Sequence, residues 1–121
     1  MIKKHNKFLH DRELAVMRLV WDRGEISDSQ VQQELARTDN IDPAGVAEII
    51  RELVQNGVVS GREEERTYVY TPLVSRREVE SALLHDLRDR MFSGSPEELV
   101  KACVAHEIFS RDQLRHIAST L

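Results

Sequence analysis

The stretch from Ile41 to Pro72, IDPAGVAEIIRELVQNGVVSGREEERTYVYTP, decides the fold of this chain. It begins as a helix, because Asp42 is a good N-cap and Pro43 suits the first helical position, where its missing N–H is not needed. The helix ends at Asn56-Gly57, because glycine accepts the left-handed conformation there without steric cost. Between these ends, apolar residues recur at three- and four-residue spacing and form one apolar stripe: Val46, Ile49, Ile50, Leu53 and Val54.

The second half of this stretch predicts a β-hairpin. Val58 and Val59 open one strand, and polar, aromatic and β-branched residues alternate along the return strand from Thr67 to Thr71. The segment Arg62–Arg66 is too charged to be buried, so we expect it to form the exposed turn between the strands. A helix followed by a hairpin is the winged-helix arrangement, in which the helix enters a DNA groove and the hairpin tip contacts the backbone.

The residues before Ile41 complete this arrangement. A helix begins near Asp11 and ends at Gly24, and the lone apolar residue Ile26 is consistent with a short strand. The segment Ser27–Gln30 has the pattern of a capping box, which opens a second helix that runs to about Arg37. The sequence therefore predicts a mainly helical winged helix-turn-helix domain over residues 1–73.

Residues 74–121 have a different pattern, that of three short amphipathic helices opened by Ser75, Ser95 and Ser110. Such a small segment buries too little apolar surface to be stable alone, so it must pack against its own winged helix or against a second copy. We expect a homodimer, which would place two recognition helices on a palindromic site. The expected dimer contacts are apolar residues of the three helices: Leu83, Leu87, Met91, Leu99, Cys103, Val104, Leu114 and Ile117.

Composition restricts the class of protein. No apolar run reaches the roughly 18 residues of a membrane span, no secretory signal opens the chain, and a single cysteine suits a reducing compartment. We therefore expect a soluble cytoplasmic protein without membrane contact. Cys103, His106 and His116 are too few and too widely spaced for a metal site or a nucleophilic centre, so we expect no metal, no cofactor and no enzymatic activity.

The chain resembles the penicillinase-repressor (BlaI/MecI) family, which also includes copper-responsive repressors of the CopY type. The resemblance covers nearly the whole chain in the right order. It implies a homodimeric winged-helix transcriptional repressor bound to operator DNA. The matching residues are Glu13–Met17, Val20-Trp21, Gly24, Ile26-Ser27, Val31, Leu35, Leu53, Gly57-Val58, Arg66–Arg76, Phe92–Pro96 and Leu99-Val100.

Several residues on the expected DNA-binding face depart from the family pattern. Ala44-Gly45 replaces a threonine pair, Glu48 and Glu52 stand where neutral or basic residues are usual, and the hairpin has the acidic run Glu63–Glu65. We expect Ala44, Gly45, Glu48 and Arg51 to face bases, and Ser27, Arg62, Arg66 and Thr67 to hold phosphates, with Lys3, Lys4 and Lys7 as further phosphate contacts. The same acidity motivates an alternative, a winged-helix protein-interaction or anti-repressor module that has lost DNA binding.

The two switches known in the resembled family have no counterpart in these residues. The Asn-Phe bond cut in the penicillinase branch aligns with Ala102-Cys103, and the cysteine-rich metal motif of the copper branch is missing. The inducing signal, and any sensor protease or effector that delivers it, therefore stay open.

Overall fold

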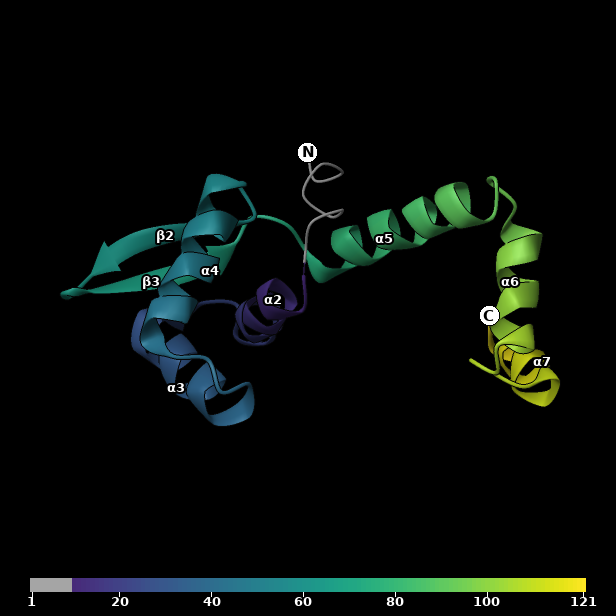
Figure 1. Cartoon of the computed structure of the whole chain (residues 1–121), viewed down its shortest axis with the longest axis horizontal. Coiled ribbons are helices and arrows are strands. Elements are labelled where there is room, and N and C mark those ends of the chain that lie inside the picture. The colour runs from purple at the N-terminus through teal and green to yellow at the C-terminus, as the bar shows by residue number, and fades with distance from the viewer. Residues whose placement is uncertain (1–9) are drawn as a thin grey trace. The chain divides into compact units, whose positions relative to one another are not determined.

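The computed structural model describes residues 10–121, and Figure 1 shows their helices and strands. The structure divides into two compact units, the first ending at Ala82 and the second running from Leu83 to Leu121. The helices and strands of the described range are α2 (Asp11–Arg23), β1 (Ile26–Ser27), α3 (Asp28–Thr38), α4 (Pro43–Gln55), β2 (Val59–Glu64), β3 (Thr67–Pro72), α5 (Arg76–Met91), α6 (Pro96–Ala105) and α7 (Arg111–Thr120). The predicted fold class, a mainly helical winged helix-turn-helix, is confirmed. No helix in this range is long and apolar enough to cross a membrane.

The three strands form one antiparallel sheet in the order β1-β3-β2. Ile26 of β1 pairs with Tyr70, and β2 pairs with β3 from Val59 opposite Pro72 to Glu64 opposite Thr67. In Figure 1, the hairpin of β2 and β3 extends past one side of α4.

The hairpin turn is shorter than the sequence predicts. Arg62, Glu63 and Glu64 belong to β2, and only Glu65 and Arg66 form the turn, with φ of 49° and 70°. The prediction that Arg62–Arg66 is all turn was wrong because charge prevents burial but does not prevent backbone pairing. This end of the hairpin is exposed, so charged side chains are compatible with a strand there.

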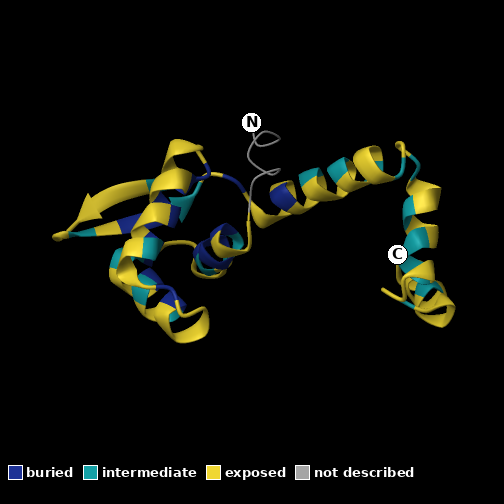
Figure 2. Ribbon diagram, in the orientation of Figure 1, coloured by how far each residue is buried: buried dark blue, intermediate teal, exposed yellow. Residues whose placement is uncertain are grey.

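The core of the first unit lies between α2, α3, α4 and the base of the sheet (Figure 2). The three helices turn their apolar stripes inward, and residues of all three strands, Ile26, Val59 and Tyr70, close the other side. The most completely buried large side chains are Met17, Ile26, Leu35, Leu53, Val16, Val20, Val31, Val46 and Val58.

The beginning of α5 belongs to this same core. Val79 is buried, and Trp21 Nε1 donates a hydrogen bond of 2.9 Å to the Val74 carbonyl oxygen. The Arg76 guanidinium lies 5.7 Å from the centre of the Trp21 ring, within the range of a cation–π contact. Trp21 of α2 therefore contacts both the segment before α5 and its first turn, and Val79 places this turn in the core.

The second unit has helices without a core. No residue of α6 or α7 is buried, and the one buried residue of α5, Val79, packs in the first unit. Figure 2 shows exposed and half-buried positions only along α6 and α7. Local devices still define these helices: Ser95 and Ser110 cap α6 and α7 by accepting the backbone N–H of Glu98 and Gln113 at 3.1 Å each.

Candidate nucleic-acid interface

Helix α4 presents one exposed face opposite its buried stripe. Its N-terminus is fixed by Asp42, whose carboxylate accepts the Gly45 backbone N–H at 2.8 Å. Val46, Ile49, Ile50 and Leu53 then turn inward, whereas Val54, which was predicted to share their stripe, is 43% exposed because it lies at the edge of the stripe. The exposed side carries one basic and two acidic residues, and its members include Ala44, Ala47, Glu48, Arg51, Glu52, Val54 and Gln55.

Gly45, which the sequence places on the base-facing side, has a local structural role. It is half-buried, and a Cβ added there would lie 2.9 Å from both Asp42 Oδ1 and Ile41 Cγ2. Glycine therefore leaves room for the side chain that caps its own helix.

Two grooves flank α4. One, of about 570 Å³, lies between α4 and the start of α2, and Glu48 and Glu52 line it together with Asp11 and Arg12. The other, of about 470 Å³, lies between α4 and the hairpin, and its lining residues include Ala47, Arg51, Gln55, Gly61 and Tyr68. The acidic residues of α4 thus face the first groove, and its one arginine faces the hairpin.

An aromatic pair forms the hairpin side of the second groove. The rings of Tyr68 and Tyr70 stack with centres 6.4 Å apart, and the absence of a side chain at Gly61, opposite Tyr70 in the sheet, makes room for them. The Tyr70 hydroxyl donates to Asp28 Oδ1 at 3.2 Å. Burial and the Asp28 carboxylate together raise the pKa of Tyr70 to about 12. Sequence reasoning missed this pair as part of the interface, although alternation along β3 places both tyrosines on one face.

The hairpin carries two arginines in different states. Arg62 donates to Glu64 Oε2 at 2.8 Å and to Glu25 Oε2 at 3.1 Å, and these hydrogen bonds raise the pKa of the guanidinium. Arg66 lies in the exposed turn and has no ion pair within residues 10–121. Of the two phosphate contacts predicted here, Arg62 is therefore already paired with carboxylates, whereas Arg66 has no carboxylate partner among the described residues.

The remaining predicted phosphate contacts lie at the ends of β1 and β3. The Ser27 hydroxyl caps α3 by accepting the Gln30 backbone N–H at 3.3 Å, while the Ser27 N–H donates to the Gln30 amide oxygen at 3.0 Å. Thr67 is half-buried at the start of β3. Lys3, Lys4 and Lys7 lie outside the described residues.

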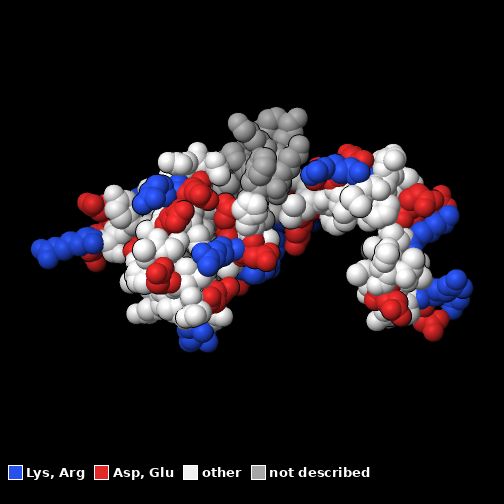
Figure 3. Space-filling model, viewed as in Figure 1, with Lys and Arg blue, Asp and Glu red and all other residues white. Residues whose placement is uncertain are grey.

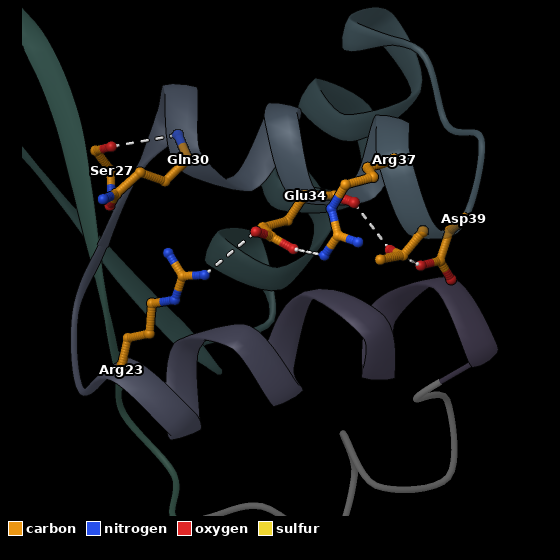
Figure 4. A network of polar contacts seen from close by, with 7 residues as sticks. Arg23, Ser27, Gln30, Glu34, Arg37 and Asp39 are labelled. Carbon is orange, nitrogen blue, oxygen red and sulfur yellow. Dashed lines mark hydrogen bonds and ion pairs between the residues drawn. The ribbon is translucent and has the colours of Figure 1, made fainter.

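A second ionic cluster joins α2 to α3 through Arg23, Glu34 and Arg37 (Figure 4). The Glu34 carboxylate accepts from Arg37 at 2.7 Å and from Arg23 at 3.4 Å. The hydrogen bond from Arg37, followed by its charge and that of Arg23, lowers the pKa of Glu34. Two further arginines are thus engaged within the fold and leave less positive charge for a ligand.

The charge of this unit is negative overall. Residues 10–82 include nine arginines, no lysine and fifteen acidic residues. Figure 3 shows basic and acidic side chains interspersed, without a continuous basic surface on the face in view. Within the described residues, Arg51 of α4 and Arg66 of the hairpin are the cations of the candidate interface that no carboxylate pairs.

The predicted dimer contacts all lie in the second unit, on α6, on α7 and on the part of α5 from Leu83 onward. Leu83, Leu87 and Ile117 are about 40% exposed, and Met91 is 70% exposed. The other four, Leu99, Cys103, Val104 and Leu114, are half-buried. Four further apolar residues of this unit, which were not among the predicted dimer contacts, are also exposed: Leu84, Val100, Ile108 and Leu121.

Cys103 belongs to this apolar surface and is half-buried on α6. Within residues 10–121, no three His, Cys, Asp or Glu side chains gather in a way that a metal ion requires.

Comparison with known proteins finds one matching family model and several related regulators. The family model described as penicillinase repressor matches residues 9–121. The penicillinase repressor of Bacillus licheniformis is 23% identical over 113 residues, which cover 93% of this chain and 88% of that protein. A MarR-family transcriptional regulator from Streptomyces coelicolor, 22% identical with a TM-score of 0.51, covers 99% of this chain and 81% of its own and shares the fold.

Two solved structures match a shorter part of the chain. The solution structure of the DNA-binding domain of the repressor BlaI is 29% identical with a TM-score of 0.55. The monomeric form of Bacillus licheniformis BlaI in complex with the blaP half-operator is also 29% identical, with a TM-score of 0.52. Each covers 57% of this chain and 84% of its own.

Proposed function

The chain belongs to the penicillinase repressor family of DNA-binding transcriptional repressors, and we propose that it acts as a homodimer on a two-fold symmetric operator. Residues 1–73 are the DNA-binding part and residues 74–121 the dimerisation part, with the first turns of α5 packed on the former through Val79. The site of action is the cytoplasm, where the operator lies.

The DNA contacts divide between α4 and the hairpin. Ala44, Gly45, Glu48 and Arg51 face the bases of one major groove, and Arg66, Arg62, Thr67 and Ser27 lie toward the phosphates. Support comes from the exposed face of α4, from the free guanidinium at the hairpin tip, and from the related BlaI monomer, whose DNA is a half-operator. One half-site for each copy is what a two-fold dimer requires.

The observation that carries the dimer is the lack of any buried residue in the second unit. The large apolar side chains of α5, α6 and α7 beyond Leu83 remain exposed or half-buried within one chain. Exposed apolar surface on this scale is typical of a protein–protein interface. A second copy of the same three helices covers it by the symmetric contact of a two-fold dimer.

Fluorescence anisotropy tests the DNA contacts. Sites are first selected from random double-stranded oligonucleotides, and binding is then measured at several salt concentrations. Affinity should fall steeply with salt, and Arg51→Ala should weaken binding to the selected site by about tenfold or more. Arg18→Ala, which removes the same charge from an exposed position on α2, should have little effect.

Sedimentation or light scattering tests the dimer. Leu87→Asp places a charge in the proposed interface and should give a monomer at micromolar concentration. Leu73→Asp makes the same change at an exposed leucine of the first unit and should leave the dimer intact. A wild-type protein that is monomeric under these conditions overturns the proposal.

The second candidate, a protein-interaction module, is favoured by one observation. The hairpin arginine Arg62 is neutralised by Glu25 and Glu64, and Glu63 and Glu65 add further negative charge beside it. A module that has lost DNA would enrich no sequence from the oligonucleotide pool and would show no salt-dependent binding. That outcome would overturn the repressor function and support the protein-interaction module.

A further inference from the structure

The exposed face of α4 carries both a hydrogen-bond acceptor and a hydrogen-bond donor on long side chains. Glu48 and Arg51 are three residues apart on this face, and neither has an ion pair or side-chain hydrogen bond within residues 10–121. Other acid–base pairs at this spacing do close: Glu34 and Arg37 meet at 2.7 Å. Glu48 stands on the side of this face toward α2 and Arg51 on the side toward the hairpin, so the two offer an acceptor and a donor, one helical turn apart, to an external partner.

The neighbouring positions let these two side chains reach furthest. Ala44 lies one turn before Glu48 and Ala47 lies beside it, and both are exposed. Short side chains at these positions allow the helix to approach the floor of a groove. Glu48 and Arg51 are then the long side chains at the centre of the face.

A carboxylate restricts which groups it can meet in DNA. It only accepts hydrogen bonds and is repelled by phosphates, so it is favourable only against a base-edge donor in the major groove. Those donors are cytosine N4 and adenine N6, and adenine places the N7 acceptor beside its donor, facing the same carboxylate. Cytosine N4 has no acceptor beside it on its own base and is the better partner.

Arg51 completes the pattern, because guanidinium donates to guanine O6 and N7. A C·G pair presents the cytosine donor next to the guanine acceptors, which matches the order of Glu48 and Arg51. We propose that these two residues make the repressor select an operator half-site with a C·G pair under the centre of α4, Glu48 accepting from cytosine N4 and Arg51 donating to guanine. This inference rests on the proposed function, since it names the base pair read by the same face.

Glu52 supplies a matched control for Glu48. Like Glu48, it is exposed and lines the groove between α4 and α2, but it lies one turn later on the helix. Glu48→Gln and Glu52→Gln each remove one negative charge near the DNA, so both should raise general affinity. Only Glu48→Gln removes the proposed contact with cytosine, so only it should change base preference.

The test begins with selection from random double-stranded oligonucleotides by the wild type and both variants. The wild type and Glu52→Gln should enrich half-sites with one invariant C·G pair. Glu48→Gln should lose that preference or shift it to adenine, the usual partner of glutamine. Circular dichroism of the variants should match that of the wild type, because both positions are exposed.

Modified cytosines then isolate the single atom. N4-methylcytosine at the invariant position puts a methyl group where the N4 hydrogen points into the major groove, and it should weaken wild-type binding roughly 5- to 150-fold. It should change binding of Glu48→Gln much less. 5-Methylcytosine leaves N4 intact and should have a small effect on either protein.

The outcomes separate this inference from the proposed function. If the wild type enriches a site but Glu48→Gln keeps the same base preference, and N4-methylation has no effect, the base-reading role is wrong and the repressor stands. If the wild type enriches nothing and shows no salt-dependent binding, both are wrong.

Discussion

The two units of this chain begin helices with the same capping box, but only the first unit buries apolar side chains. Ser27 opens α3 and Ser110 opens α7 with the same capping box, each serine paired with the glutamine three residues later. Helix α3 then buries Val31 and Leu35, whereas α7 buries nothing. A cap therefore determines where a helix begins, while burial depends on the apolar surface that other helices and strands provide.

The difference also shows what each unit needs to be stable. A fully buried leucine or valine gains about 1.5–3 kcal/mol over an exposed one, and the first unit has many such residues in one cluster. The second unit gains little in this way within a single chain. We therefore expect its stability to depend on protein concentration, because a second copy must supply the missing contacts.

The largest expected effect compares one leucine from each unit. Leu53→Ala removes a side chain with no exposed surface and should lower the free energy of unfolding by about 2–5 kcal/mol at every protein concentration. Leu87→Ala removes a side chain that is 42% exposed in one chain. Its cost should shrink toward zero as the protein is diluted below the dimer dissociation constant. Urea unfolding followed by circular dichroism at several concentrations measures both.

An equal, concentration-independent loss for the two variants would contradict the comparison. It would mean that α5 has a complete set of apolar partners within its own chain.

The elements that sequence predicted best are those determined by neighbouring residues. The cap at Asp42, the proline after it and the stripe that includes Val46 and Leu53 all act within one helix, and the structure has them as predicted except for the exposed Val54. The limits of β2 were wrong at Glu64 because strand length at an exposed hairpin depends on backbone pairing with β3, which residue polarity does not report.

The contacts that sequence did not reveal join residues far apart in the chain. Arg62 pairs with Glu25, 37 residues away, and the Tyr70 hydroxyl bonds to Asp28 across 42 residues. Nothing in the composition of the hairpin shows that one arginine is neutralised and that the other, Arg66, has no ion pair in the described part of the chain. The DNA-facing residues of α4 remain predictions, because a single chain without DNA shows only which side chains are exposed.

The second prediction tests whether the shared capping device has the same value in both units. Ser27→Ala and Ser110→Ala should each cost about 1 kcal/mol of local helix stability. Amide hydrogen exchange should accelerate at Gln30 in the first variant and at Gln113 in the second, because each loses its serine acceptor. Ser110→Asp keeps an acceptor and should preserve slow exchange. Unequal losses would show that packing, rather than the cap, determines where these helices begin.

A smaller effect is expected at the hairpin turn. Glu65 has a φ of 49°, a conformation that asparagine tolerates better than glutamate. Glu65→Asn should raise the free energy of unfolding of the first unit by a few tenths of a kcal/mol, up to about 1. Glu63→Asn makes the same change within β2, where φ is not positive, and should not stabilise. A stabilisation by Glu63→Asn of the same size would point to loss of negative charge as the cause.

The last prediction concerns the hydrogen bond between the Tyr70 hydroxyl and Asp28 in the first unit. The pH dependence that it gives to the stability of this unit appears only at alkaline pH. Tyr70 has a pKa of about 12 in the folded chain against an ordinary value of 10. Between these values the unfolded chain loses the phenolic proton more readily than the folded chain, so ionisation favours unfolding. The stabilising contribution is complete below pH 10 and is lost as pH rises toward 12.

Tyr70→Phe should therefore flatten the fall in unfolding free energy between pH 10 and pH 12, at the cost of a modest loss at neutral pH from the missing bond to Asp28. Tyr68→Phe is the matched control, since Tyr68 is half-exposed on the same face and has no bond to Asp28. Its alkaline profile should follow the wild type. If the two variants give the same profile, the hydrogen bond between Tyr70 and Asp28 adds nothing to the pH-dependent stability of the first unit. Apolar packing alone would then distinguish the first unit from the second.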